Sequence, residues 1–134
     1  MAKLDSLLTS GLCPCGSNKK YSGCCGLYID ARGIPATAEV LMRSRYTAYT
    51  LCNKEYLLAT WHPSTRPEGL NLEEQSKLKW LGLQVKRHVQ QDADHAIVEF
   101  VARSRQNGIG CRLHEVSNFV REERRWFYVD GELD

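Results

Sequence analysis

Hydrophobic residues recur along the chain with two different spacings, and the change falls near residue 80. Within residues 36–52 they return every three or four positions, which is typical of one face of a helix. This face consists of Ala38, Leu41, Met42, Ala48, Tyr49 and Cys52. Pro35 stands where a helix commonly starts, and Glu39 and Arg43 form an exposed pair on another face. The segment is therefore predicted to be an amphipathic helix.

Two shorter helices and four strands are predicted after it. Asn53 can cap a helix over residues 54–60, a third helix falls within residues 70–79, and the proline-containing segment between them is predicted as a loop. Apolar and polar residues then alternate, which predicts strands over residues 80–91, 94–106, 110–121 and 125–130. Consecutive strands with short turns favour antiparallel pairing. We expect an α+β domain over residues 36–134, with helices packed on a curved, mainly antiparallel sheet.

Residues 1–35 are predicted to form a separate zinc knuckle. The segment is too short to build an apolar core, yet it contains four of the six cysteines, as C-x-C and, eight residues later, C-C. Soft thiolates can close a tetrahedral shell around zinc. Adjacent cysteines make strained disulfides, so free thiols are the main alternative. The spacing predicts one structural zinc ion held by Cys13, Cys15, Cys24 and Cys25.

The charge and apolar content of the chain limit its partners and its location. The formal net charge is +2, and without a clustered excess of basic residues we expect no direct nucleic-acid partner. No apolar run approaches the ~20 residues that span a bilayer. The first residues lack the continuous apolar core of a secretory signal. We therefore expect a cytoplasmic protein with reduced thiols and no membrane span.

One charge interrupts the apolar face of the long helix. Arg45 lies between Met42 and Ala48, and a buried charge needs a partner. In the strand at residues 111–119 the odd positions are more apolar and are predicted to face inward, which makes Glu115 the candidate partner. The pair is interpreted first as a structural bond between helix and sheet. The alternative is the floor of a ligand pocket lined by Arg45, Tyr46, Tyr49, Trp61, His62 and Glu115.

The string CPCGSNKKYSGCC resembles the SEC-C motif at the C-terminus of the protein-translocation ATPase SecA. The resemblance implies zinc on the same four cysteines, with Cys25 at a position that is often histidine in SecA. It also implies docking on partner proteins, because in SecA the motif contacts an export chaperone and the ribosome.

The strings MRSRYTAY, YLLATWHPSTRP and RWFYVDGEL are similar to those of the bacterial YchJ-like proteins. That family joins a SEC-C motif to a cone-shaped domain like that of nuclear transport factor 2. The resemblance covers nearly the whole chain and implies the same fold. The family has no established activity to carry over.

Two functions are consistent with these observations. In the first, the protein is an adaptor whose knuckle docks on a protein partner, such as the ribosome or translocation machinery, through Lys19, Lys20 and Tyr21. A closed four-cysteine site favours docking over catalysis, although solvated lysines with the tyrosine packed on the knuckle are an alternative. In the second, the cone domain binds or transforms a small molecule. No catalytic motif is present to name a reaction.

Overall fold

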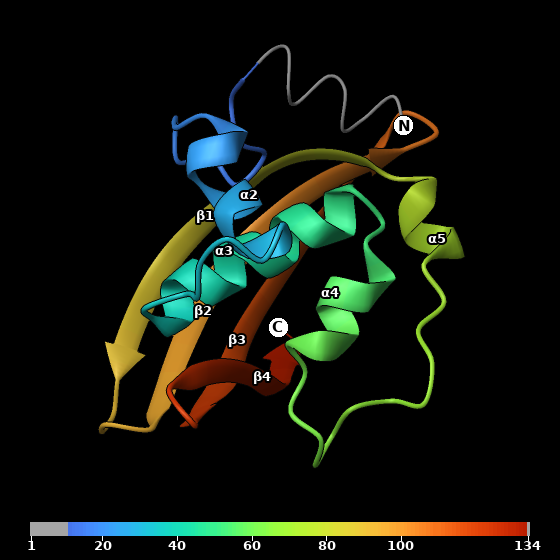
Figure 1. Ribbon diagram of the computed structural model, residues 1–134. Helices are drawn as coiled ribbons and strands as arrows, with labels where there is room; N and C mark the ends of the chain where they lie inside the picture. The colour runs from blue at the N-terminus through green and yellow to red at the C-terminus, as the bar shows by residue number, and fades with distance from the viewer. Residues whose placement is uncertain (1–10, 134) are drawn as a thin grey trace.

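A four-stranded antiparallel sheet curves around a central helix in the computed structural model, which describes residues 11–133 (Figure 1). Each strand pairs with the next along the chain. The strands are β1 (Lys79–Gln90), β2 (His95–Gln106), β3 (Ile109–Glu122) and β4 (Arg125–Leu133). The predicted α+β architecture and antiparallel meander are confirmed.

Helix α3 (Ala38–Thr50) lies on the concave face of the sheet. Its first turn is capped by Thr37, whose hydroxyl accepts a hydrogen bond from the Val40 N–H at 3.2 Å. Such a cap satisfies one of the free N–H groups at a helix start. The helix ends at Thr50, and Cys52 has a φ of +54° in the turn that follows. The prediction that Cys52 lies on the apolar face of the helix is therefore wrong.

Two short helices precede the sheet, as the sequence predicted: α4 (Lys54–Ala59) and α5 (Glu73–Ser76). Asn53 caps α4 by accepting from the Tyr56 N–H at 3.1 Å. The loop between the two helices begins along β4, because Thr60 O accepts from the Tyr128 N–H at 2.9 Å and the His62 N–H donates to Tyr128 O at 2.8 Å. These bonds fix the start of the loop against the sheet.

The hydrophobic core fills the space between α3 and the concave face. The residues of β2 that face α3 are its even positions, and those from Ala96 to Ser104 are buried. On β3 the predicted inward face is confirmed for Ser117 and Phe119, which are buried, and for Glu115, which lines a cavity. Cys111, nearer the start of the same strand, is exposed, because the helices do not extend over that end.

The cysteine-rich segment is packed on α3. It consists of a loop, the 3-10 turn η1 (Tyr21–Gly23) and helix α2 (Cys25–Ile29). Its buried residues belong to the same apolar cluster as those of α3 and the sheet. A Cβ atom at Gly26 would lie 2.6 Å from Tyr21 O, so only glycine fits where α2 crosses η1. The small knuckle therefore buries its residues against the larger domain, and the two share one apolar cluster.

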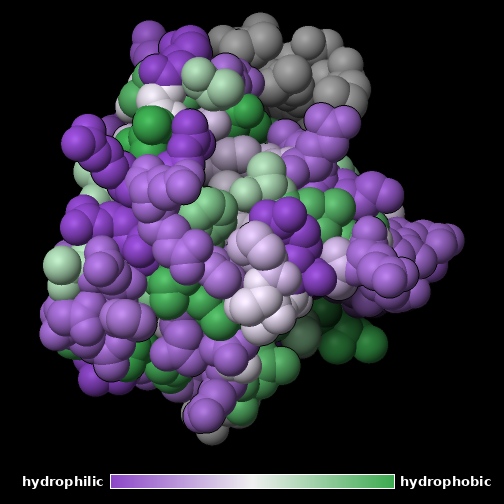
Figure 2. Space-filling model, turned by 60° about the horizontal axis from the view of Figure 1, so that its bottom comes forward, coloured by the Kyte–Doolittle hydropathy of each residue, from purple (hydrophilic) through white to green (hydrophobic). Residues whose placement is uncertain are grey.

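Hydrophilic side chains cover most of the face shown in Figure 2, with smaller hydrophobic areas between them. The large apolar side chains that are exposed come from separate parts of the chain: Leu12, Ile34, Leu81, Val89, Ile109, Leu113 and Leu133. Within residues 11–133, no helix is long and apolar enough to cross a membrane.

Candidate metal centre and cone pocket

The structure brings together the four cysteines that the spacing predicted as ligands. Their sulfur atoms all lie within 4.8 Å of one another, and those of Cys15 and Cys24 are 3.6 Å apart. Four sulfurs at about 2.3 Å from one zinc ion would be separated by roughly 3.8 Å in a tetrahedron. Cys13, Cys15 and Cys25 are buried, and Cys24 is half-buried. The cluster therefore has the composition and size of a site for one metal ion.

A tight turn holds the first pair of cysteines in place. The Cys13 N–H donates to Lys19 O at 2.8 Å, and the Gly16 N–H donates to Cys13 O at 3.3 Å. Gly16 and Asn18 have φ values of +84° and +66°, which glycine and asparagine adopt more readily than other residues. The turn folds the chain back so that the C-x-C pair faces the start of α2.

Hydroxyl groups surround the sulfur cluster. Ser17 Oγ lies 3.1 Å from Cys24 Sγ, and Thr47 Oγ1, on α3, lies 3.7 Å from Cys13 Sγ. Hydrogen bonds from such groups stabilise thiolate ligands. Hydrogen bonds from Cys13 and Cys25 lower the pKa of the Cys15 thiol, whereas hydrogen bonding to Cys13 and Cys15, together with burial, raises the pKa of Cys25.

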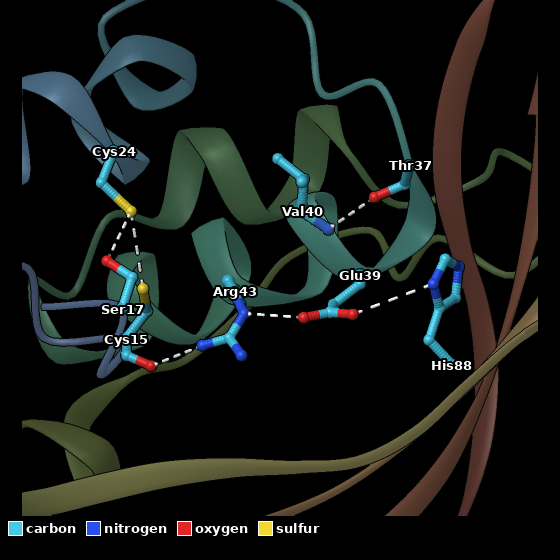
Figure 3. A network of polar contacts seen from close by, with 8 residues as sticks. All are labelled: Cys15, Ser17, Cys24, Thr37, Glu39, Val40, Arg43 and His88. Atoms are coloured by element: carbon cyan, nitrogen blue, oxygen red, sulfur yellow. Dashed lines mark hydrogen bonds and ion pairs between the residues drawn. The ribbon is translucent and has the colours of Figure 1, made fainter. Parts of the chain in front are cut away.

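A chain of polar contacts connects the cysteine cluster to α3 and β1 (Figure 3). Arg43 donates from Nη1 to Cys15 O at 2.9 Å and from Nε to Glu39 Oε2 at 3.1 Å. Glu39 Oε1 lies 3.8 Å from His88 Nδ1 on β1. The Glu39–Arg43 pair is confirmed, but its predicted exposed position is wrong for Arg43, which reaches the knuckle and is only one-quarter exposed.

The predicted docking residues separate into two groups. Lys19 and Lys20 are exposed, but Tyr21 is only 1% exposed, so its predicted place on the surface is wrong. The Tyr21 ring fills the small interior between η1 and α2. Leu12, which the sequence analysis did not single out, is 59% exposed and pairs with Lys20 through a β-bridge. The exposed knuckle surface therefore combines Leu12, Lys19 and Lys20.

A cavity of about 190 Å³ lies between α3 and the sheet. Four of the six predicted pocket residues line it: Arg45, Tyr46, Tyr49 and Glu115. The apolar part of its wall comes mainly from Met42, Phe100, Ala102, Leu113 and Phe119. The predicted floor of the pocket is therefore present.

Trp61 and His62 are not part of this cavity, contrary to the prediction. Their loop runs along β4 instead of over the mouth of the cone. The His62 ring packs edge-on against Phe127, with centroids 5.9 Å apart, and its Nε2 lies 2.8 Å from Glu122 Oε2. The Trp61 ring packs edge-on against Tyr128, with centroids 5.1 Å apart.

Arg45 is buried on α3, as predicted, but its contacts differ from those expected. Its Nη1 donates to Leu57 O at 2.8 Å and to Thr60 Oγ1 at 2.7 Å. Its guanidinium carbon lies 5.2 Å from the Trp61 ring centroid and 4.5 Å from that of Tyr128. Burial lowers the pKa of Arg45. The end of α4 and two aromatic rings therefore accommodate this charge.

Glu115 is linked to Arg45 through Tyr128 and not directly. Its Oε2 accepts hydrogen bonds from Ser117 Oγ and, at 3.3 Å, from the Tyr128 hydroxyl. The structure gives no ion pair between Arg45 and Glu115, both of which lie in its described part. The predicted direct pair is wrong, because Tyr128 occupies the position between the two charges.

Among the further polar residues that line the cavity, two with unpaired buried atoms were missed from the sequence. Gln75 comes from α5 and Trp80 from the start of β1. Within residues 11–133, buried Gln75 Oε1 and buried Trp80 Nε1 have no hydrogen-bond partner. Leaving a buried polar atom unpaired costs about 1–3 kcal/mol. Neither residue stands out in the sequence, because only the fold brings α5 and β1 to the same cavity.

Comparison with known proteins identifies the family. Residues 37–131 match the family described as "YchJ, middle NTF2-like domain". The chain belongs to the YchJ family. A UPF0225 protein of Bordetella pertussis is 53% identical to this YchJ family member over 127 residues, covering 90% of this chain and 92% of that protein. A UPF0225 protein of Ralstonia nicotianae is 52% identical over 131 residues, covering 90% of each.

Two solved structures resemble this YchJ family member, and both are described as SEC-C motif containing proteins. The protein from Rhodopseudomonas palustris has a TM-score of 0.80 and 34% identity, covering 90% of this chain and 96% of that one. The protein from Psychrobacter arcticus has a TM-score of 0.76 and 28% identity, covering 91% and 82%. These likenesses agree with the SEC-C resemblance of the cysteine segment.

Proposed function

We propose that this YchJ family member is a cytoplasmic zinc-binding accessory protein whose knuckle docks on a protein partner. The observation that carries the proposal is the cluster of four sulfur atoms within 4.8 Å of one another. Four cysteines supply every ligand of a tetrahedral zinc ion, so no position is left for a water molecule or a substrate. The function of such a site lies in the surface that it shapes.

The knuckle surface suits a protein contact. Leu12 provides an exposed apolar side chain beside the cations Lys19 and Lys20. An apolar centre with a charged rim is typical of a transient interface. The two lysines favour an acidic partner surface, and the SEC-C resemblance makes ribosomal and translocation proteins the first candidates.

The test compares two doubly substituted chains by pulldown from a cell extract. Lys19→Glu with Lys20→Glu reverses the charge of the knuckle surface. Lys54→Glu with Arg124→Glu makes the same change at exposed positions on α4 and at the β3–β4 turn. We expect the knuckle variant to lose specific partners that the control retains at matched salt, while zinc content and melting temperature stay unchanged in both. Equal recovery of partners by both variants would show that the docking surface lies elsewhere.

A second function, small-molecule binding in the cone pocket, rests on a different observation. The cavity is mostly apolar, and its lining includes Glu115 together with Gln75 and Trp80, two residues whose Oε1 and Nε1 atoms are buried and unpaired. Convergent polar groups in an apolar cavity are typical of ligand sites. The volume of about 190 Å³ is below that of sites for drug-sized molecules, so the ligand is small.

Cavity filling tests this second function. Ala102 lines the cavity and is buried, so Ala102→Leu should occupy part of its volume. Small molecules that copurify with the parent chain, detected by native mass spectrometry, should be absent from this variant. Zinc content and knuckle partners should not change. If the same copurifying molecules remain on Ala102→Leu, the cavity is not the ligand site.

A further inference from the structure

Basic side chains gather on the convex face of the sheet, away from the helices. The odd positions of β2 point to this face, since its even positions from Ala96 to Ser104 are buried on the side of α3, and Val101 is the odd position that is itself buried among its neighbours. Directly paired residues of antiparallel strands point to the same side of a sheet. Lys79 pairs with Arg105, and Arg103 pairs with Arg112. Four cations from β1, β2 and β3 thus form one cluster, which we call the arginine cluster.

The arginine cluster has no neutralising partners within the sheet. All four side chains are exposed, and none forms an ion pair with another residue of the described part of the chain. The acidic residue farther along β2, Glu99, already contacts Arg87 at 3.3 Å and His114 at 2.7 Å. Like charges placed directly opposite each other destabilise a sheet. The free protein therefore bears an electrostatic cost that an external anion would relieve.

We propose that the arginine cluster binds the phosphate backbone of double-stranded RNA. Arginine presents a planar fork of donors that matches phosphate oxygens, and three of the four cations are arginines. Neighbouring strands lie about 4.8 Å apart and alternate residues of one strand about 6.7 Å apart, so the charges form a compact block. The narrow major groove of A-form RNA brings two phosphate rows close enough to face such a block.

The residues around the arginine cluster on the convex face indicate which form of RNA it binds. The positions that pair with or adjoin the cluster on these strands include Gly82, Gln84, Val101, Gly110 and His114. The ring among them, the His114 imidazole, already contacts Glu99 Oε2 at 2.7 Å, so this face lacks the series of aromatic side chains on which the bases of single strands usually stack. Two glycines also leave the surface open to a broad ligand. Binding through phosphates alone is independent of sequence and strongly dependent on salt.

The experiment uses the full zinc-loaded chain and a fluorescently labelled 20-base-pair RNA duplex, with affinity measured by anisotropy across salt concentrations. Arg103→Gln with Arg112→Gln removes two charges from the cluster. Arg124→Gln with Arg125→Gln removes two exposed charges at the opposite end of β3 and serves as the matched control. We expect the slope of log affinity against log salt to fall by about two for the cluster variant, because each lost phosphate contact lowers it by about one. The control should keep the parent slope.

Melting temperature separates loss of binding from loss of folding. Because the cluster variant relieves like-charge repulsion, it should melt at the same temperature as the parent or higher. A B-form DNA duplex of the same sequence should bind more weakly than the RNA. The proposal is overturned if no salt-dependent RNA binding is detected, if both variants lose affinity equally, or if polyglutamate binds the cluster and RNA does not.

Discussion

The ring of Tyr128 lies under the guanidinium of Arg45, with 4.5 Å between the guanidinium carbon and the ring centroid. The hydroxyl of the same tyrosine donates to Glu115 Oε2 at 3.3 Å. A residue of β4 therefore connects a buried cation on α3 with a carboxylate on β3. Cation–π contacts of a desolvated arginine contribute up to about 2 kcal/mol. The contact with Tyr128 therefore offsets part of the free-energy cost of burying the Arg45 charge inside the cone.

Arg45→Met should destabilise the fold by about 3 kcal/mol, because it removes two buried charge-assisted hydrogen bonds, those to Leu57 O and Thr60 Oγ1. Arg43→Met, at a partly exposed position, should cost about 1 kcal/mol. Urea denaturation measures both values. Equal losses of unfolding free energy in the two variants would contradict the inference that Arg45 contributes more because it is buried.

A pair of double-mutant cycles separates Tyr128 from Glu115 as the partner of Arg45. Combining Arg45→Met with Tyr128→Leu should show a coupling of about 1–2 kcal/mol, since the ring and the cation are in contact. Combining Arg45→Met with Glu115→Gln should show about 0.5 kcal/mol or less. A larger coupling to Glu115 would restore the direct pair that the sequence suggested.

Purified protein should hold one zinc ion per chain, and Cys24→Ser should release it. Because the knuckle and α3 share one apolar cluster, metal loss should lower the melting temperature of the whole chain in a single transition. Elemental analysis and thermal melting followed by tryptophan fluorescence measure the two effects. Cys111→Ser, at an exposed position on β3, should change neither. Two separate transitions would show that the knuckle and the domain fold independently.

Arg43→Ala should weaken metal retention, since Arg43 holds the carbonyl of a ligand residue at 2.9 Å. Groups that orient metal ligands typically contribute 10–100-fold in affinity. Competition with a chromophoric chelator measures the loss. Arg32→Ala is the matched control, because Arg32 also donates to a knuckle carbonyl, that of Ser22, but from an exposed position. The same loss in both variants would argue against a specific role for Arg43.

The helices, the strands and the grouping of the four cysteines could be predicted because their signals are local. The alternation of apolar and polar residues predicted the bounds of the four strands to within a few residues. Asn53 predicted the start of α4, because asparagine commonly caps helices. The C-x-C and C-C pairs were identified as a candidate zinc site, because four thiols so close in sequence have few other stable roles than metal binding. None of these inferences required knowing which segments meet in space.

The errors concern contacts between distant segments. Tyr21 was assigned to the surface because it lies with two lysines in the short loop between the two cysteine pairs, but the knuckle buries that ring against Gly26. The partners of Arg45 were sought among carboxylates, whereas the fold supplies a carbonyl of α4 and two aromatic rings. A pattern of side-chain charges cannot reveal backbone carbonyls or ring faces as partners.

The arginine cluster was missed for a related reason. A net charge of +2 suggested no nucleic-acid partner, because summing charges along the chain discards their positions. Strand register places Lys79 beside Arg105 and Arg103 beside Arg112, while most acidic residues lie elsewhere. The register could not be predicted from the sequence, because the β-bulges of β1 shift it between Trp80 and Gly82.

Alkaline pH should destabilise the protein through its buried tyrosines. Burial raises the pKa of Tyr56 to about 12, and its hydroxyl contacts Ser44 Oγ at 2.7 Å. In the unfolded chain a tyrosine titrates near 10. Between pH 10 and 12 the unfolded state therefore releases a proton that the folded state keeps, and stability falls as pH rises. Below pH 10 both states hold the proton, so this contribution is fully present.

Tyr56→Phe isolates this contribution to the pH dependence. The variant should start less stable at pH 8, because the hydrogen bond to Ser44 is lost, but its free energy of unfolding should decline less steeply from pH 10 upward. The difference in decline should reach about 2–3 kcal/mol at most, since each pKa unit corresponds to 1.36 kcal/mol. Urea denaturation at pH 8, 10 and 11 measures it. Parallel declines in the parent and in Tyr56→Phe would show that this hydroxyl ionises as readily in the folded protein as in the unfolded chain, which the buried position between α3 and α4 argues against.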